Sequence, residues 1–365
     1  MHTNGTHLRR TVVNGPEFDG DVNKAGEFVG DHASLSASLC LAQMWEWYCG
    51  SASLSYQMLI HHISHLPPLD YRYGWNLSNV DHQMLALNLL LTVGTETLFA
   101  SPNCAPWGEN AKRATPADRA ARRAVESSNL TFLAVACFFQ ILLNRRYIIE
   151  NPADAELFTM SPLKPLRELP YFMALLDQCQ CGGMIDGQFI RKRTHFQSNR
   201  QMNQLNILCQ GGHVHTHLRG GGKAAMSAKY PEGECKRIIA DGTAPLDVTE
   251  GGSTPLPQLP SSFKTKSFEE KIAVLQKHAF DNGLRESWRK IVIPWLLTTS
   301  FVGPPFENET AESGIPFGNE TVNEVRTSET ATDVPPPPPG LGEMCSRRRQ
   351  RNPELDKYEH AVCNE

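Results

Sequence analysis

The chain places a cysteine in a short loop that contains two prolines. The loop reads Ser101-Pro-Asn-Cys104-Ala-Pro-Trp-Gly108 and follows a strand-like apolar segment, residues 97–101. A thiol in such a loop can act as a nucleophile when neighbouring groups stabilise its thiolate. A loop cysteine taken alone is more often inert, so the role of Cys104 depends on the groups beside it.

A carboxyl group ends the next predicted strand. Residues 147–150, Tyr-Ile-Ile-Glu, precede Asn151 and Pro152. A carboxyl group at this point can donate or accept a proton at a bound base. Ligands of open α/β sheets bind beyond the carboxyl ends of the strands. We therefore expect Cys104 and Glu150 to lie on neighbouring strand ends.

Two earlier turns have residues that suit a nucleotide-like cofactor. The first predicted strand, 44–49, leads into the small-residue turn Gly50-Ser-Ala-Ser53, where a ligand can approach a helix N-terminus. Asp70 follows about 20 residues later, at the position of an acid that binds ribose hydroxyls. Each feature also has an ordinary structural explanation, since small turns pack helices onto strands and Asp70 can cap a turn.

The elements that must position these groups alternate between strands and helices. The predicted strands are 44–49, 68–71, 97–101, 147–150, 172–178 and 193–197, and the predicted helices are 53–64, 81–92, 117–146 and 224–241. This order favours an α/β fold with a doubly wound, Rossmann-like, mostly parallel sheet and a C-terminal hairpin around Gly182 and Gly183. The apolar run 130–143 is shorter than the roughly 20 residues that span a bilayer, so we expect a buried helix and no membrane partner.

The flanking segments have a different composition. We expect a disordered leader at 1–32, a main domain at 33–245, a linker at 246–264, a helical segment at 265–302 and a disordered tail at 303–365. The helical segment either docks on the main domain or forms a small helical appendix. The tail holds the basic cluster Arg347-Arg-Arg-Gln-Arg351, which is typical of nucleic-acid contacts, of a nuclear address or of a solvated tail.

The composition is that of an intracellular globular protein. The 365 residues are 40% hydrophobic, which is enough for a large core. Residues 1–10 are polar and do not resemble a secretory signal, and we expect the 10 cysteines to be reduced. The net charge of -4 gives no general attraction to nucleic acid, so DNA would be bound through local basic clusters or a partner protein.

A metal site is a weaker alternative. The motifs Cys179-x-Cys181 and Cys209-x3-His213-x-His215-x-His217 offer sulfur and imidazole ligands for a tetrahedral zinc ion, with Cys179, Cys181, Cys209 and His213 as the candidate set. Their spacing is not one of the common zinc-finger patterns, and scattered cysteines and histidines more often pack in the core or face solvent. We therefore expect no metal and keep this set as the alternative.

The order of the motifs resembles that of the cytosine-C5 DNA methyltransferases, which are class-I enzymes that use S-adenosylmethionine. The similarity covers about 40–240 and includes the acidic strand end with its glycine turn, the ribose acid, the Pro-Cys loop, the Glu-Asn strand end and a late strand with Arg191-Lys-Arg193. The chain is more similar still to a divergent group of such domains associated with mobile elements in unicellular eukaryotes. That group has segments like Asp70-Tyr-Arg-Tyr-Gly-Trp75 and Cys209-Gln-Gly-Gly-His-Val-His215.

The resemblance implies a role for each matching residue. Cys104 would attack C6 of a flipped cytosine, Glu150 would protonate or hydrogen-bond its N3 edge, and C5 would take the methyl group. Arg191 and Arg193 would hold the base or the Cys104 loop. The cofactor would be surrounded by Glu46, Tyr48, Gly50, Ser51, Asp70 and Pro102. Glu46 and Asp70 would be its hydroxyl partners, and Tyr48 would pack against its adenosine or methionine part.

The sequence departs from this family at three points. Asn103-Cys104-Ala105 stands where the family prefers Pro-Cys-Gln, so the bracing proline has moved to Pro102. Ala52 replaces the second glycine of the cofactor turn, which fits only if that position does not need a positive φ. Only a short segment follows Arg193 where the family inserts its target-recognition domain. Two interpretations stay open: an active methyltransferase, or a degenerate fold that serves a mobile element as a nucleic-acid- or cofactor-binding module.

Overall fold

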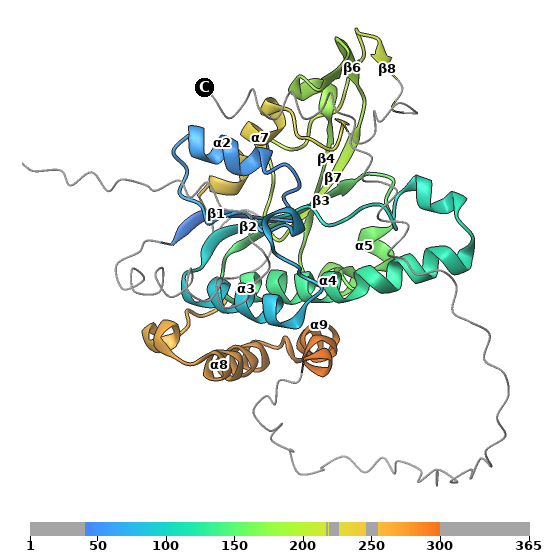
Figure 1. Ribbon diagram of the computed structural model, residues 1–365. Coiled ribbons are helices and arrows are strands. Elements are labelled where there is room, and N and C mark those ends of the chain that lie inside the picture. The colour runs from blue at the N-terminus through green and yellow to red at the C-terminus, as the bar shows by residue number, and fades with distance from the viewer. Residues whose placement is uncertain (1–40, 217, 219–225, 246–254, 300–365) are drawn as a thin grey trace, which may run out of the picture. The chain divides into compact units, whose positions relative to one another are not determined.

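The computed structural model describes residues 41–216, 218, 226–245 and 255–299 (Figure 1). These residues belong to one compact unit, Met1–Phe306, and a second unit, Glu307–Glu365, lies outside the described residues. The predicted leader, the predicted tail with its basic cluster, and residues 246–254 of the predicted linker also lie outside them.

A five-stranded sheet forms the centre of the described part. Its order is β1 (Ala42–Trp47), β2 (Thr95–Ala100), β3 (Arg146–Pro152), β7 (Arg193–Ser198) and β4 (Phe172–Asp177). The first three strands run parallel, and β7 is antiparallel to both of its neighbours. Nearly all residues of β1 to β3 are buried, as expected for strands covered on both faces. The predicted mostly parallel sheet with a C-terminal antiparallel pair is confirmed.

Helices cover both faces of this sheet (Figure 1). α2 (Ser53–Ile60) and α7 (Glu232–Thr243) pack together on one face, whereas α3 (Val80–Thr92) and α4 (Pro116–Leu142) lie on the other. The sheet is therefore doubly wound, and the fold is Rossmann-like. The short helical turns are η2 (Tyr71–Tyr73), η3 (Glu109–Arg113), α5 (Leu157–Met160), η4 (Lys164–Glu168), η5 (Gln178–Cys181) and η6 (Ser261–Thr265).

The helix α4 is the main core helix of its face. Thr115 caps it by accepting the N–H of Asp118, and Pro116 occupies its first turn. By length and composition alone the helix could cross a membrane, but 61% of its most apolar window is buried inside the protein. Phe132 stacks on Trp47 of β1 at a ring distance of 5.4 Å. These contacts are those of a helix packed on a sheet.

The two C-terminal helices form a further layer outside α4 (Figure 1). α8 (Phe268–Asp281) starts with a capping box between Ser267 and Glu270, and α9 (Arg285–Thr298) follows it. Trp288 of α9 is fully buried and stacks on Phe139 of α4 at 6.0 Å. The helical segment therefore docks on the main domain, which is one of the two arrangements that its sequence allowed.

The predicted second strand, 68–71, is not a regular strand. Residues 65–69 make two isolated parallel bridges to β1, one at His65 and one at Leu69. Pro67 and Pro68 stand between these bridges, and because proline has no backbone N–H, a continuous ladder cannot form. The chain nevertheless passes beside β1 and brings Asp70 to its carboxyl end.

A small three-stranded sheet was not predicted. It consists of β5 (Met184–Ile185), β6 (Gln188–Ile190) and β8 (His215–Thr216). The turn between β5 and β6 is Asp186-Gly187, with φ values of +52° and +73°, which suits a two-residue hairpin turn. The predicted hairpin of 172–178 and 193–197 is the antiparallel pair of β4 and β7, and the connection between these strands contains Gly182, Gly183 and the short β5–β6 hairpin.

Candidate active site

The Cys104 loop is tied to the ends of both neighbouring strands. Asn151, which follows Glu150 on β3, donates its side-chain N–H to the carbonyl of Pro102 over 3.0 Å. Ser101 donates its hydroxyl to the carbonyl of Tyr48, after β1, over 2.9 Å. The loop is therefore held above the carboxyl ends of β1 and β3, where ligands of this fold bind.

Asn103, which stands in place of the family's proline, also fixes the loop. Its side-chain oxygen accepts the N–H of Ala105 over 3.0 Å, and its amide nitrogen donates to Glu126 of α4 over 2.7 Å. The carbonyl of Cys104 accepts the N–H of Trp107 and of Gly108 at 3.0 and 2.9 Å. Hydrogen bonds thus supply the rigidity that a proline would have given this position.

Glu150 lies next to the loop in a largely buried position, as its place at the end of β3 predicted. One carboxylate oxygen accepts the hydroxyl of Tyr230 over 2.9 Å. The other is buried and has no hydrogen-bond partner among the described residues. The ammonium group of Lys192 lies 4.0 Å from that second oxygen. The second oxygen therefore has acceptor capacity that no described hydrogen bond uses.

The thiol of Cys104 responds to the same charges. Desolvation raises its pKa above the ordinary value, the nearby carboxylate of Glu150 raises it further, and Lys192 lowers it. Glu234 of α7, fully buried close by, has a pKa raised to about 8, first by burial, while Lys192 again lowers it. Cys104, Glu150 and Lys192 therefore form one electrostatically connected group, which we call the thiol cluster. The cluster brings together the thiol and carboxyl groups that the sequence placed on neighbouring strand ends.

The late basic motif is divided between two sites. Arg193 forms two hydrogen bonds of 2.9 Å with Asp177, and Arg191 lies 3.8 Å from the same carboxylate. Lys192, between them, is the residue that faces Glu150. The structure thus places Arg191 and Arg193 on Asp177 rather than on Cys104, and Lys192 is the site residue that sequence reasoning missed.

We expect Lys192→Met to raise the pKa of Cys104 further, because it removes a cation that favours the thiolate. Since the thiolate reacts with alkylating reagents and the thiol does not, the pH profile of Cys104 alkylation measures this pKa. The profile should move to higher pH in Lys192→Met and stay in place in the matched variant Arg191→Met. A profile unchanged by Lys192→Met would contradict the cluster.

The turn after β1 is held by two acidic residues. Glu46 is fully buried, and one of its oxygens accepts the N–H and the hydroxyl of Ser55 at 2.7 and 2.5 Å. Burial raises the pKa of Glu46 to about 7. Asp70 is half-buried and accepts one N–H on each oxygen, from Gly50 and from Arg72, at 2.9 and 3.0 Å. A carboxylate has about four acceptor positions, so Asp70 retains lone pairs for further donors.

The remaining predicted cofactor residues have different surroundings. Tyr48 donates its hydroxyl to the carbonyl of Asn129 on α4 over 3.2 Å, so its ring is directed toward that helix. Ser51 is exposed, and its hydroxyl lies 2.9 Å from that of Ser53. Pro102 is a buried residue of the Cys104 loop. Gly50 has open space beyond its Cα, since an added Cβ would meet no atom within 4 Å.

Ala52 caps α2 in the left-handed conformation, with φ at +52°. An L-residue pays for this conformation, whereas glycine does not. We expect Ala52→Gly to raise the free energy of unfolding by about 1 kcal/mol, measured by urea denaturation. The control Ala120→Gly, at an exposed position inside α4, should lower it by about 1 kcal/mol. If Ala52→Gly instead lowered the free energy of unfolding, the left-handed conformation of Ala52 would not be strained.

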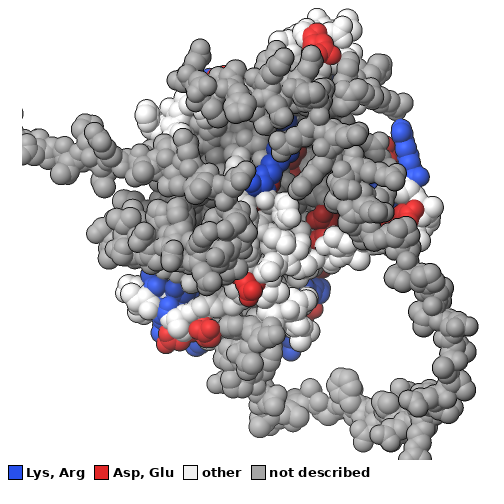
Figure 2. Space-filling model, viewed as in Figure 1, with Lys and Arg blue, Asp and Glu red and all other residues white. Residues whose placement is uncertain are grey.

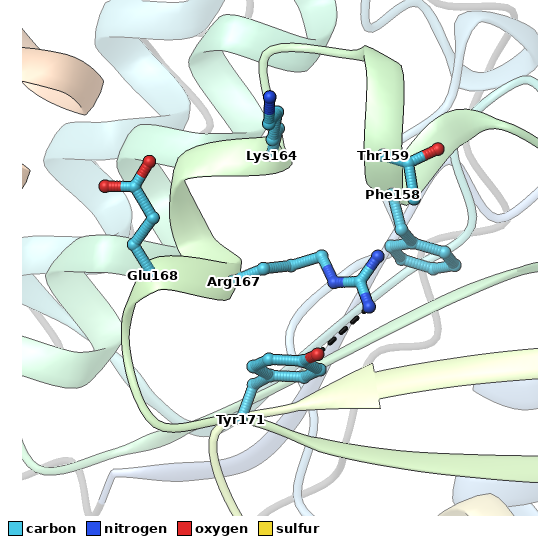
Figure 3. Close-up of a pocket in the computed structure, with 6 residues that line it drawn as sticks. All are labelled: Phe158, Thr159, Lys164, Arg167, Glu168 and Tyr171. Carbon is cyan, nitrogen blue, oxygen red and sulfur yellow. Dashed lines mark hydrogen bonds between the residues drawn. The ribbon is translucent and has the colours of Figure 1, made fainter.

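A separate pocket of about 320 Å³ lies beside η4, away from these residues (Figure 3). Its lining residues are Phe158, Thr159, Lys164, Arg167, Glu168 and Tyr171. Arg167 lies over the ring of Tyr171 and donates to its hydroxyl over 3.0 Å (Figure 3). None of these residues belongs to the site predicted from the sequence.

Charges of both signs occur on the surface. Figure 2 shows Lys and Arg side chains close to Asp and Glu side chains on the described part of one face. Lys277 pairs with Asp281 within α8, and Lys290 of α9 pairs with Glu168 of η4, each at 2.8 Å. Among the described residues in this view (Figure 2), basic and acidic side chains alternate, so the charges do not form the continuous basic patch that is typical of a nucleic-acid surface.

The structure brings together three of the four residues of the alternative metal site and replaces the fourth, Cys181, with His215. Cys179, Cys209 and His213 lie together, and their fourth neighbour is His215. Cys181 packs instead in the core beside α7. Residues two apart in the tight helical turn η5 point in different directions, which separates Cys181 from Cys179.

The comparisons with known proteins give limited information. No family model matches the chain, and no curated protein matches it. Among solved structures, the crystal structure of the Dnmt2 methyltransferase of S. pombe is similar, at 16% sequence identity and a TM-score of 0.28. The match covers 44% of this chain and 51% of that chain, so it spans about half of the neighbour's length.

The strand order and the turns after β1, β2 and β3 define the class of fold. It is a doubly wound, Rossmann-like α/β fold with a C-terminal antiparallel pair. The TM-score is too low to add to this assignment, which rests on the sheet and the residues at its carboxyl edge.

Proposed function

We propose that the chain is an S-adenosylmethionine-dependent methyltransferase that acts on C5 of cytosine in DNA, with Cys104 as the nucleophile. The observation that carries the proposal is the thiol cluster, in which Cys104, Glu150 and Lys192 interact at the ends of β2 and β3. A thiol and a carboxyl group with a free oxygen are the two groups that such a reaction requires of the protein.

The chain's residues support each step of this chemistry. The thiolate of Cys104 adds to C6 of the flipped base, and the electrons of the C5–C6 double bond make C5 a nucleophile. Glu150 stabilises the charge that develops in the ring by hydrogen-bonding or protonating the N3 edge through its unpartnered oxygen. Lys192 favours the thiolate before the attack. After methylation, a water molecule acting as base takes the C5 proton, and the electrons of the C5–H bond restore the double bond as the thiolate of Cys104 leaves C6.

The turn after β1 is suited to hold the cofactor. S-adenosylmethionine, when bound, supplies an electrophilic methyl group. Asp70 has free lone pairs for ribose hydroxyls, and the open space at Gly50 leaves room at the N-terminus of α2. One oxygen of Glu46 accepts both hydrogen bonds from Ser55, and Glu46 is fully buried, so it is less accessible to a ligand than the half-buried Asp70. We therefore assign hydroxyl recognition to Asp70.

One observation favours a second candidate, a degenerate methyltransferase fold that binds cofactor or nucleic acid without transfer. Tyr230 occupies one oxygen of Glu150, and the pKa of Cys104 is raised, so the thiol is largely protonated at neutral pH. In this alternative the cluster remains from an ancestral site. Cofactor binding with no transfer to DNA or RNA would favour it.

The proposal is tested first by calorimetric titration of the full chain with S-adenosylmethionine. We expect saturable binding that is weakened at least about tenfold by Asp70→Ala, because a lost hydrogen bond to a charged group is worth about 1.5 kcal/mol or more. The control Asp81→Ala, in the exposed first turn of α3, should bind as the unchanged chain does. Absence of binding at millimolar cofactor would overturn the proposal.

A further inference from the structure

We propose that Cys179, Cys209, His213 and His215 bind one structural Zn²⁺ ion. The four residues come from three parts of the chain: η5, the segment that follows β7, and β8. Their ligand atoms all lie within 4.8 Å of one another. We call this group the zinc cluster. It is separate from the thiol cluster and serves no step of the proposed methyl transfer.

The distances within the zinc cluster suit a tetrahedral ion. The Sγ atom of Cys209 lies 3.7 Å from Nε2 of His213 and 3.5 Å from Nε2 of His215. Zinc bonds of about 2.3 Å to sulfur and about 2.0 to 2.1 Å to nitrogen place tetrahedral ligands roughly 3.3 to 3.8 Å apart. Both distances fall in this range, and the other pairs of ligand atoms lie within 4.8 Å, so a tetrahedral ion requires only that these atoms move closer together.

The backbone between the ligands is shaped to bring them together. Gly211 and Gly212 have φ values of +90° and +83°, which allows the tight turn from Cys209 to His213. The N–H of Gly211 points at the sulfur of Cys209 over 3.3 Å, an arrangement that stabilises a thiolate. Asp177, held by Arg193, accepts the N–H of Cys209 over 2.9 Å and fixes the loop. Metal ligands commonly depend on such supporting hydrogen bonds.

The surrounding sheet needs a source of stability other than its core. The strands β5, β6 and β8 are two or three residues long, and their buried apolar side chains are Ile185 and Ile190. Met184 is 54% exposed. Small elements with so little apolar burial are commonly held by a metal or a disulfide. The zinc cluster joins β8 to η5, at the end of β4, and so fastens this sheet to the main one.

The ligand chemistry identifies the ion. Two thiolates and two imidazoles are a common ligand set of structural zinc. Four protein ligands leave no open position for substrate, so a structural role follows rather than a catalytic one. Hard cations such as Mg²⁺ prefer oxygen ligands, and the cluster offers none.

The test measures the metal content of the full chain, expressed with zinc and dialysed against metal-free buffer. We expect about one zinc ion per chain, and a loss of at least about tenfold in Cys209→Ser and in His215→Ala. The matched control is Cys181→Ala, which removes a nearby cysteine outside the cluster and should retain the ion. Zinc content near zero in the unchanged chain, or equal loss in Cys181→Ala, would overturn the proposal.

A second measurement covers variants that fail to fold. Cobalt(II) added to the unchanged chain after chelation should give the intense visible absorption of a tetrahedral site with thiolate ligands, and zinc should displace it. Octahedral cobalt absorption, or a Cys179–Cys209 disulfide found by mass spectrometry under conditions that preserve thiols, would contradict the site.

Discussion

Replacing Cys104 with alanine is expected to lower methyl transfer by a factor on the order of 10³ or more, because the variant cannot form the covalent bond to C6. Cofactor binding should persist, since Gly50 lies on the turn after β1 and is hydrogen-bonded to Asp70 before η2, whereas Cys104 lies after β2. Transfer of a labelled methyl group to cytosine-containing DNA measures the first effect, and calorimetry with S-adenosylmethionine measures the second.

The control for this experiment removes a different thiol. Cys137 is buried inside α4, outside the thiol cluster, and Cys137→Ala should retain transfer. RNA of matched sequence, used in parallel, distinguishes the nucleic acid that serves as substrate. Transfer that persists in Cys104→Ala would refute the role of this thiol, even if the chain remained a methyltransferase.

Replacing Trp288 with alanine is expected to lower the free energy of unfolding by about 3 to 5 kcal/mol. The ring of Trp288 is fully buried between α9 and α4, where it stacks on Phe139 and contacts Phe138 and Phe280 edge-on. Its removal leaves a cavity at the junction of the C-terminal helices with the main domain. Urea denaturation followed by circular dichroism measures the loss.

The matched control lies on the same helix. Leu297 is 82% exposed, so Leu297→Ala should change the free energy of unfolding by no more than about 0.5 kcal/mol. If α8 and α9 formed an independent appendix, they would unfold in a small separate transition. Trp288→Ala would then shift that transition alone and leave the unfolding of the main domain unchanged. A single transition at lower urea is the result that the shared core predicts.

The arrangement of Cys104 and Glu150 was predictable from strand order. Short apolar segments in βα alternation fix which turns share an edge of the sheet, so the two residues had to meet. Lys192 was harder to predict, because it lies between β6 and β7, where the alternation of strand side chains does not apply. The dipeptide Asp186-Gly187 is a standard signal for a two-residue hairpin turn, so the β5–β6 turn was also predictable from the sequence.

Other features depend on contacts that a local pattern does not contain. Tyr230 donates a hydrogen bond to Glu150, although the two residues are 80 positions apart in the sequence. Asp177 binds Arg193 because the pairing of β4 with β7 places them opposite each other. The weak second strand follows from Pro67 and Pro68, whose effect on hydrogen bonding outweighs the apolar pattern. These contacts and the irregular second strand therefore depend on strand pairing and on the missing N–H groups of proline, which the periodicity of apolar residues does not reveal.

Covalent trapping tests the central claim most directly. The full chain is incubated with S-adenosylmethionine and DNA in which 5-fluorocytosine stands in random sequence contexts, and the product is examined by intact mass and peptide mapping. Fluorine replaces the C5 proton that must leave, so the adduct between Cys104 and C6 should accumulate with the methyl group attached. The proposal predicts this adduct at Cys104 and its loss in Cys104→Ala. A chain that binds cofactor and DNA but forms no adduct, or an adduct at another residue, would contradict it.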